Sequence, residues 1–479
     1  MCRREGESGI LPYFTRPFRD VASAPKSLCK NVLASYLILP YDEEVTSVDH
    51  VGERSDGKRR EVLMTSVDFR TRYEGDAENL DPTEFIEERL TPLLEANGAE
   101  AGRGASRLGL APLSLDVDGE RLMFAVDDGR LTVNRARSDA LVIGLDNRAF
   151  SDLMQDVAST FGLNMTGRAE VVQGTIDAFV EWEPVLRCLL DGRPVYDPGT
   201  IAFEDRRGAP LDLHQSFTLQ DTPEDIGHFL GEAGFLHMVG VFNDAEMAEV
   251  SAELNAAIEE AERDDGASWW ARTDGGDWYP SRILGFNQKA PTLRELLHSE
   301  RFAAIGTFTD DRFVQRDPDI GDAAEGLLKK VGVLEGISDV SWHKDCSLGG
   351  HSRHCCGLIV GISVTGANRE NGELGVVPGS HRANVALLGV EGLDLPRLPL
   401  PTRTGDVTVH CSCTLHMSRP PVSAERRVVY TGFGLAPRSG DHRVLIDPAQ
   451  ARRERASMND HTRRQQRGHT APRLTSFEL

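Results

Sequence analysis

The sequence predicts an α+β protein of two domains, with a double-stranded β-helix (a jelly roll) braced by helices in the C-terminal half and a small α+β domain before it. Over the second half of the 479 residues, short apolar segments alternate closely with turns, and candidate metal ligands stand at widely separated points. This pattern is typical of a double-sheet jelly roll. The first half carries short alternating segments and amphipathic helical stretches instead, which predict the α+β domain.

Changes in composition divide the chain into four predicted regions. Residues 1–65 contain a polar spacer and predict a leader that is disordered in part. Residues 66–200 are predicted to form the α+β domain, and a stretch rich in Pro, Gly and Asp follows them. Residues 216–440 are predicted to form the jelly roll. Residues 441–479 are basic and lack periodicity, which predicts a disordered tail.

The composition excludes several classes of protein. The formal net charge of -22, from 53 basic and 75 acidic residues, argues against a general binder of nucleic acid or of anionic membranes. No apolar run reaches the length of a membrane span, and Met1–Glu7 lacks the apolar core of a signal peptide. The eight cysteines show neither zinc-ribbon nor disulfide-scaffold spacing. We therefore expect a cytoplasmic protein with reduced thiols and no stable insertion into a membrane.

The elements of the first domain follow from turn and capping signals. Asp81–Glu84 predicts the start of a helix and Asn97-Gly98 its end. Apolar residues then alternate between 113 and 133 around two turns containing Asp-Gly, which predicts a meander of three strands. Three further elements are expected, namely a fourth strand over 139–145, a helix capped by Asn147 and a closing helix over 182–190.

The predicted jelly roll opens with helix, strand and helix. Thr222–Asp225 is a capping box with Pro at the first helical position, and Asn243–Glu246 repeats the capping signal. Between them, Phe235–Phe242 predicts the first strand. The apolar stripes of these helices are expected to brace the sheet. Residues 269–288 interleave aromatic and polar residues and predict an exposed loop, which either lines the substrate entrance or packs on the core.

Two segments about seventy residues apart carry the candidate metal ligands. His343 and Asp345 stand two positions apart in a segment that is expected to be extended, so both side chains point to one face. A second expected strand, Gly405–His416, brings His416. Two histidines and one carboxylate with open coordination positions form the facial triad of non-haem Fe(II) oxygenases. The segments therefore predict a metal site composed of these three residues.

Other histidines are alternatives at this stage. On the second expected strand, His410 and His416 share a face with small polar residues, so His410 is an alternative ligand. His351 and His354, next to two cysteines, resemble zinc ligands, although such close packing favours a loop. His381 follows a Pro-Gly-Ser turn and is predicted to be a turn residue or a neighbour of the site.

Three separate blocks resemble the phytanoyl-CoA dioxygenase (PhyH) family of Fe(II)- and 2-oxoglutarate-dependent oxygenases. These blocks are Trp342–Asp345, Asn371–Arg382 and Leu415–Pro420 with the arginines that follow, and the resemblance covers roughly residues 216–440. It implies a cupin-like jelly roll that uses Fe(II), 2-oxoglutarate and O2. Pro420-Pro421 stands where the family usually has Pro-Asn, which changes the loop but removes no ligand.

The resemblance also implies roles for individual residues. His343, Asp345 and His416 match the iron ligands. Arg427 matches the residue that pairs with the far carboxylate of 2-oxoglutarate, with Ser418 assisting, and Arg426 is the alternative by one position. The family's halogenases have a small residue in place of the carboxylate ligand, so Asp345 favours hydroxylation.

The predicted first domain resembles the sterol-carrier-protein-2 type of lipid-binding fold in its order of elements, and the alternative is an accessory domain without a ligand. We therefore expect a dioxygenase that hydroxylates a small or apolar organic metabolite and releases succinate and CO2. One alternative is a lipid-binding or scaffold protein with an inactive oxygenase domain. The other is a cupin-type metalloenzyme that does not use 2-oxoglutarate.

Overall fold

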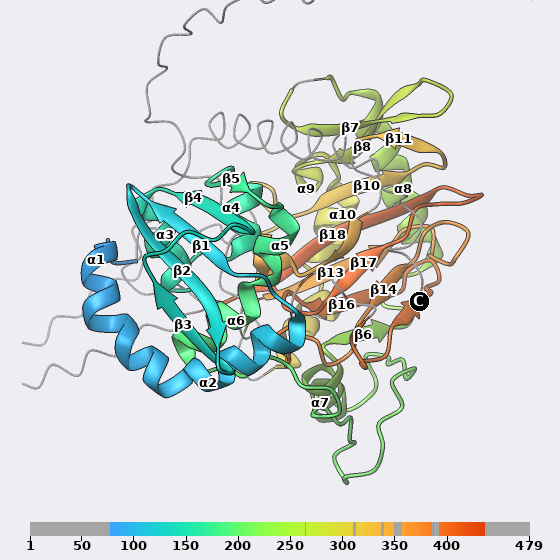
Figure 1. Ribbon diagram of the computed structural model, residues 1–479. Helices are drawn as coiled ribbons and strands as arrows, with labels where there is room; N and C mark the ends of the chain where they lie inside the picture. Colours follow the sequence, from blue (N-terminus) through green and yellow to red (C-terminus); the bar gives the residue numbers. More distant parts are fainter. Residues whose placement is uncertain are drawn as a thin grey trace, which may run out of the picture.

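The computed structural model describes residues 77–435, apart from 264, 310–312, 337–339, 349–356, 386 and 388–391. The predicted leader and tail and the candidate zinc residues His351 and His354 lie outside the described residues. Within the described ranges, no helix combines the length and hydropathy that crossing a membrane requires. Figure 1 shows an N-terminal part, coloured blue to green, beside a larger C-terminal part, coloured green to red. The predicted division into two domains and its boundaries stay predictions.

The N-terminal part is built on a five-stranded sheet with the strand order β3-β2-β1-β4-β5. As predicted, the first three strands form an antiparallel meander, whereas β1 and β4 pair in parallel. Helices pack against the sheet around a core of their own that includes Phe124, Phe150 and Trp182. The strands are β1 Leu113–Val117, β2 Glu120–Asp127, β3 Arg130–Asn134, β4 Leu141–Leu145 and β5 Ala169–Gln173. The helices after the meander are α3 Asn147–Met154, α4 Thr160–Met165, α5 Ile176–Glu181 and α6 Glu183–Asp191.

The first helical segment is longer than predicted. Asp81 caps it by accepting hydrogen bonds from the Thr83 and Glu84 amides, and the helix runs through α1 (Pro82–Glu84), a π-helical turn (Phe85–Leu90) and α2 (Thr91–Leu108). It ends at Gly109, which has a φ of 65°. The predicted end at Asn97-Gly98 is therefore wrong.

Close packing against β3 explains why Gly98 and Gly102 lie inside this helix. A Cβ at Gly98 would lie 3.3 Å from the Leu131 carbonyl oxygen, and one at Gly102 would lie 2.6 Å from the same strand. Asn97 links this helix to α6, because its side-chain amide donates a hydrogen bond to the Leu189 carbonyl at 2.8 Å. The Asn-Gly pair thus supports tertiary contacts, which outweigh the local preference for a helix end.

Helices cover one face of the large sheet of the C-terminal part. The Asn243 side chain and Glu246 form the predicted capping box of α8 (Asp244–Glu259). α7 (Pro223–Ala233) begins with Pro and ends at Gly234 in the left-handed conformation. Their buried residues join one core with those of the sheet. Three shorter helices follow along the chain, α9 Phe286–Lys289, α10 Pro291–Leu297 and α11 Glu300–Ala303.

Two antiparallel sheets form the rest of the C-terminal part. The larger has nine strands, in the order β11-β7-β8-β10-β18-β13-β16-β6 with β9 paired to β18, and the smaller has the order β12-β17-β14-β15. The large sheet comprises β6 Phe235–Met238, β7 Ser268–Thr273, β8 Trp278–Ile283, β9 Val314–Gln315, β10 Glu325–Lys329, β11 Val333–Glu335, β13 Gly357–Ser363, β16 Val407–Cys411 and β18 Arg426–Gly434. The small sheet comprises β12 Val340–His343, β14 Leu374–Val376, β15 Leu398–Leu400 and β17 His416–Ser418.

Two predictions about strands are corrected. The expected aromatic loop over 269–288 is largely the hairpin β7–β8, whose strands pair in the large sheet. The expected single strand Gly405–His416 is two strands in different sheets. A turn closed by the Thr414 amide and the Cys411 carbonyl, 2.8 Å apart, carries the chain from β16 to β17. The apolar and polar alternation continued through this turn, so the sequence pattern did not reveal it.

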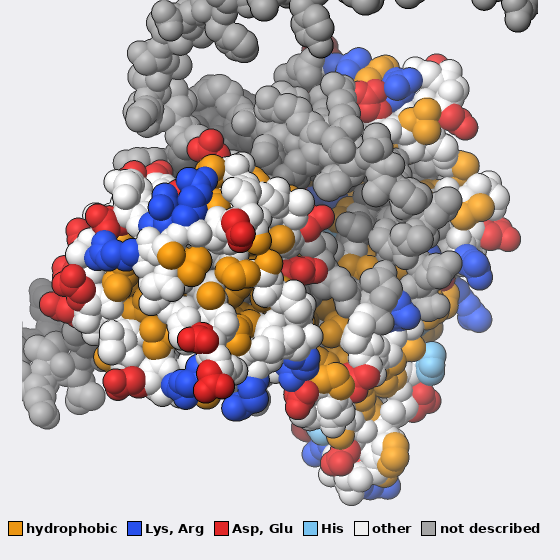
Figure 2. Space-filling view, in the orientation of Figure 1, with side chains coloured by type: hydrophobic (Ala, Val, Ile, Leu, Met, Phe, Trp, Pro, Cys, Tyr) orange, Lys and Arg blue, Asp and Glu red, His pale blue; other side chains and the backbone are white. Residues whose placement is uncertain are grey.

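The surface carries charges of both signs. Figure 2 shows hydrophobic, acidic and basic side chains interspersed on the visible face of the N-terminal part, without a field of a single sign.

Candidate metal centre

The structure brings the three predicted ligands together. β12 and β17 pair with His343 directly opposite His416. β12 ends at His343, and after Lys344 the 3-10 turn Asp345–Leu348 begins, so the expectation that the segment stays extended through Asp345 is wrong. One ligand atom from each of His343, Asp345 and His416 lies within 4.8 Å of the other two. The distances from the Asp345 carboxylate to the imidazole Nε2 atoms are 3.3 Å for His343 and 3.5 Å for His416. Neighbouring ligands on one ion lie about 3 Å apart at bond lengths near 2.1 Å, so the group fits a metal.

Hydrogen bonding sets the tautomer of His416. Its Nδ1 lies 2.9 Å from the Thr414 carbonyl, which only accepts, so Nδ1 carries the proton and donates. Nε2 then presents a lone pair toward Asp345, as metal binding requires. Burial, together with the nearby His410 and His343, holds the pKa of His416 well below its usual range, which keeps the ring neutral. The lone pair of the neutral, buried His416 ring therefore suits a divalent ion and not a proton.

The carboxylate is held in its charged form. Burial alone would raise the pKa of Asp345, but the neighbouring His416 and the hydrogen bonds to His343 and His410 keep it well below its usual range. An ionised carboxylate with two imidazoles is the donor set of a non-haem iron centre of the facial-triad type.

His410, the alternative ligand, lies beside the three residues. Its Nε2 is 3.3 Å from the second oxygen of Asp345, and its ring centroid is 4.1 Å from that of His416. His410 belongs to β16 in the large sheet, whereas His416 belongs to the small sheet. His410 is 1% exposed, and its Nδ1 has no hydrogen-bond partner among the described residues. The geometry places His410 against the Asp345 carboxylate, on the far side from His343.

Ser418 is flanked by two cationic side chains. Its Oγ accepts hydrogen bonds from Lys329 Nζ at 2.6 Å and from Arg426 Nη2 at 3.2 Å. Lys329 and Arg426 are cross-strand neighbours on β10 and β18 and are almost fully buried. Arg426 Nε is buried without a hydrogen-bond partner within the described part of the chain. Two buried cations and an unpaired donor around one hydroxyl fit a carboxylate ligand.

Arg427 does not join this group. Adjacent residues on a strand point to opposite faces, so Arg427 lies on the face of β18 that α8 covers. Its guanidinium donates to Ser251 Oγ at 2.9 Å and Asn255 Oδ1 at 2.7 Å, and it contacts Glu425. Of the two arginines considered from the sequence, the structure therefore places Arg426, and not Arg427, beside Ser418.

A cleft joins the metal ligands to Ser418 and Lys329, and the space that it encloses, together with the open solvent at its entrance, amounts to about 870 Å³. It lies between the two sheets, because its lining comes from both. Arg282 of β8 lines it and pairs with Glu325 at 2.9 Å. The Arg282 guanidinium also lies over the Trp269 ring at 4.6 Å, so the predicted aromatic segment contributes to the wall of the cleft.

Sequence reasoning did not identify Lys329. The signal was present, because Glu325, Leu327 and Lys329 alternate with apolar or small residues and thus share one face of a strand. Two charged residues on an otherwise apolar strand indicate a polar cleft. His381, by contrast, lies where predicted, near the turn, with its Nε2 donating to the Gly231 carbonyl at 2.9 Å.

Taken together, the fold and this site define a protein with a metal centre of two histidines and one carboxylate between two antiparallel sheets. Residues 230–429 match the model of the phytanoyl-CoA dioxygenase (PhyH) family. This match and the site support, at the level of the family, a non-haem iron- and 2-oxoglutarate-dependent oxygenase, as expected from the sequence.

Solved structures that are similar to this chain include those of AviO1, EctD and HygX. AviO1 from Streptomyces viridochromogenes Tue57 is 24% identical, with 43% of this chain and 91% of AviO1 covered and a TM-score of 0.35. EctD from S. alaskensis, solved with 2-oxoglutarate and 5-hydroxyectoine, is 17% identical, and the match covers 50% of this chain and 86% of EctD with a TM-score of 0.36. HygX from Streptomyces hygroscopicus, solved with nickel, 2-oxoglutarate and hygromycin B, is 19% identical, and the match covers 43% of this chain and 85% of HygX with a TM-score of 0.32. No curated protein matches the chain. The resemblance of the N-terminal part to the sterol-carrier-protein-2 fold stays a prediction.

Proposed function

We propose that the protein is an Fe(II)/2-oxoglutarate-dependent dioxygenase that hydroxylates a small or apolar organic molecule. In this reaction O2 supplies one oxygen atom to a substrate C–H bond and one to succinate, which forms from 2-oxoglutarate with loss of CO2. The observation that carries the proposal is the convergence of His343, Asp345 and His416 in a cleft that also contains Ser418 and Lys329.

The chain's own residues would hold the metal and the cosubstrate at separate places. His343, Asp345 and His416 would bind Fe(II) through three positions and leave three for small ligands. Iron supplies the activation of O2, which organic side chains do not provide. Ser418, with Lys329 and Arg426, would bind the far carboxylate of 2-oxoglutarate by charge-assisted hydrogen bonds. The three candidate metal ligands line one cleft together with Ser418 and Lys329, which favours a single cosubstrate that spans both places.

Asp345 supports hydroxylation among the oxidative outcomes of this chemistry. A carboxylate at this position fills the site that a halide would need. His410, which contacts the second oxygen of Asp345, keeps the carboxylate from rotating. The wall formed by Leu327, Ile359 and Leu374 would keep water away from the reacting bond.

The test measures succinate formed from 2-oxoglutarate by the purified full-length protein under O2, with Fe(II) and a panel of small organic molecules. We expect succinate formation that EDTA abolishes and that Asp345→Ala, which removes a ligand, reduces at least about 100-fold. Circular dichroism of Asp345→Ala should match the wild type, which separates loss of metal from loss of fold. Wild-type-like succinate formation by Asp345→Ala would refute the proposal.

The same assay separates the two alternatives. A scaffold with an inactive oxygenase domain would form no succinate with any metal or substrate. A cupin-type metalloenzyme that does not use 2-oxoglutarate would bind the metal and consume O2 at a rate independent of 2-oxoglutarate.

A further inference from the structure

The residues that alternate with the metal ligands form the outer face of the small sheet. Trp342 and Lys344 flank His343, and Leu415 and Met417 flank His416. All four are buried, with exposed fractions of 7% or less. The ligands point into the cleft, so their neighbours point out of its back wall.

The N-terminal part covers this back wall. Trp342, Leu415 and Met417 belong to one apolar cluster with Val180 of α5, and Phe161 of α4 packs against it. α4 also contacts the 3-10 turn that begins with Asp345. All three metal ligands thus lie next in sequence to residues on this side of the small sheet, which the N-terminal part contacts.

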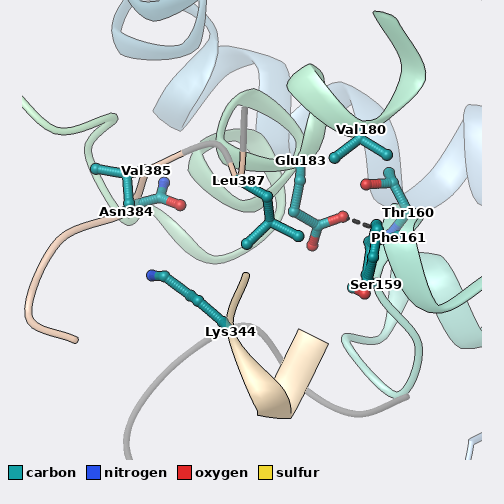
Figure 3. A pocket seen from close by; sticks show the side chains of 9 residues that line it. All are labelled: Ser159, Thr160, Phe161, Val180, Glu183, Lys344, Asn384, Val385 and Leu387. Carbon is teal, nitrogen blue, oxygen red and sulfur yellow. Dashed lines mark hydrogen bonds between the residues drawn. The ribbon is translucent and has the colours of Figure 1, made fainter. Parts of the chain in front are cut away.

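Lys344 closes the polar side of the same interface. Lys344 lines a small cavity with Glu183 and Val180, and Figure 3 shows its side chain pointing toward the side of Asn384 and Val385, with Leu387 between it and Glu183. Its Nζ donates to the Ser380 carbonyl at 3.0 Å. Lys344, which lies between His343 and Asp345 in the sequence, is therefore held in place on the side of the small sheet away from the cleft.

Hydrogen bonds fix the two parts to each other. The Asn384 side-chain amide donates to the Pro184 carbonyl at 2.8 Å and to the Arg193 carbonyl at 3.2 Å. The Tyr196 amide donates to the Asn384 carbonyl at 3.0 Å, and the Tyr196 hydroxyl donates to Asp394. An apolar cluster with several partly buried hydrogen bonds holds a defined geometry and does not act as a flexible tether.

We propose that the N-terminal part is a structural component of the metal centre. Phe161 and Val180 are positioning residues that act through Trp342, Leu415 and Met417 to hold β12, β17 and the Asp345 turn at the spacing that one ion requires. The inference rests on the proposed function only in requiring that a metal binds. Loss of the groups that orient metal ligands commonly weakens metal affinity about 10- to 100-fold.

The test compares two double variants of the full-length protein that lose the same atoms. Phe161→Ala with Val180→Ala removes the contact with the back wall. Phe85→Ala with Val133→Ala truncates the core of the N-terminal part away from the interface, because Phe85 packs on Phe150 and Val133 lies on the edge strand β3. Anaerobic titration with Co(II) gives the affinity, and the absorption spectrum of bound Co(II) reports its coordination geometry.

We expect the interface variant to bind Co(II) at least about tenfold more weakly and with an altered spectrum. The core variant should bind Co(II) with an affinity within about twofold of the wild type, even where its thermal midpoint falls further than that of the interface variant. A variant with Phe161→Leu in place of Phe161→Ala should recover most of the Co(II) affinity that the interface variant loses. Wild-type affinity and spectrum in the interface variant would overturn the inference.

Two further outcomes are distinguishable. If the interface double variant does not fold, Val180→Ala is compared with Val133→Ala alone, and equal Co(II) affinities there overturn the inference. If the wild-type protein binds no Co(II), the proposed function fails, and the role proposed for the N-terminal part fails with it.

Discussion

The charged groups around Ser418 illustrate how side-chain direction assigns chemistry to single residues. Arg426 and Arg427 are adjacent and chemically identical, but only Arg426 reaches the interior of the two sheets. Arg427 contacts polar groups of α8 instead. A carboxylate bound at Ser418 would therefore meet the guanidinium of Arg426 and the ammonium of Lys329.

This arrangement gives a matched pair of variants. Arg426→Met should raise the KM for 2-oxoglutarate at least about 30-fold, because a charge-assisted pair to a carboxylate contributes roughly 2 kcal/mol or more. Arg427→Met removes the same group one position away and should leave that KM within about threefold. Both constants follow from succinate formation at varied 2-oxoglutarate. A large KM effect in Arg427→Met, without one in Arg426→Met, would restore the assignment expected from the family resemblance.

The sequence was sufficient for some residues of the site and not for others. His343 and Asp345 were predicted together from an extended segment, but the structure ends β12 at His343 and brings Asp345 to the same place through a 3-10 turn. His416 was predicted because its block has a distinctive neighbourhood. The choice between two adjacent arginines depends on which face of β18 points inward. That face is set by pairing with β10 and β13, which lie far away in the sequence. Local pattern does not contain this information.

At the scale of elements, one carboxylate fixes the start of β16. Asp406 is 3% exposed and accepts hydrogen bonds from His237 Nε2 on β6 at 3.0 Å, from the Gly240 amide at 2.9 Å and from the Arg403 amide at 2.8 Å. Burial alone would raise the pKa of Asp406, but these donors lower it. The turn, the edge strand and the strand that carries His410 are thereby joined at one point.

We expect Asp406→Asn to lower the free energy of unfolding by about 2–4 kcal/mol, because buried donors lose a charged acceptor. Since the folded pKa of Asp406 lies below the unfolded value, its stabilising contribution is present above about pH 4 and is lost as the pH falls further. The difference between variant and wild type should therefore shrink in acid. Urea unfolding at pH 7 and at about pH 3 measures both effects.

Asp205 provides the control for this measurement. It also accepts hydrogen bonds from two backbone amides, those of Arg207 and Ala209, but it lies at the surface. Asp205→Asn should change the free energy of unfolding by less than about 1 kcal/mol. Equal effects at the two positions would show that burial of Asp406 adds nothing.

Elements were predicted well where local signals determine them and poorly where tertiary contacts do. The capping box of α8 and the Asp-Gly turns between β1, β2 and β3 lie where the sequence places them. Asn97-Gly98 reads locally as a helix end, but the packing of Gly98 and Gly102 on β3 keeps the helix continuous. The break between β16 and β17 was hidden because the alternation of side chains continues through the turn.

At the scale of the whole molecule, the small sheet lies between the cleft and the N-terminal part. Metal ligands occupy one face of β12 and β17, and the cluster around Trp342 occupies the other. A strand pair with both faces packed transmits a change on one face to the other, because close-packed interiors yield little. Binding of a metal should then stabilise regions that contain no ligand.

Hydrogen exchange measures this coupling. A metal present at 100 times its Kd adds about 2.7 kcal/mol to the stability of the states that bind it. If α4 and α5 open together with the back wall, saturating Co(II) should slow exchange of their amides as well as those of β12 and β17. The amides of β3, at the far edge of the N-terminal sheet, should change little. Asp345→Ala should show none of these differences, because it lacks a ligand. Protection confined to the C-terminal part would mean that the N-terminal part opens independently of the metal centre.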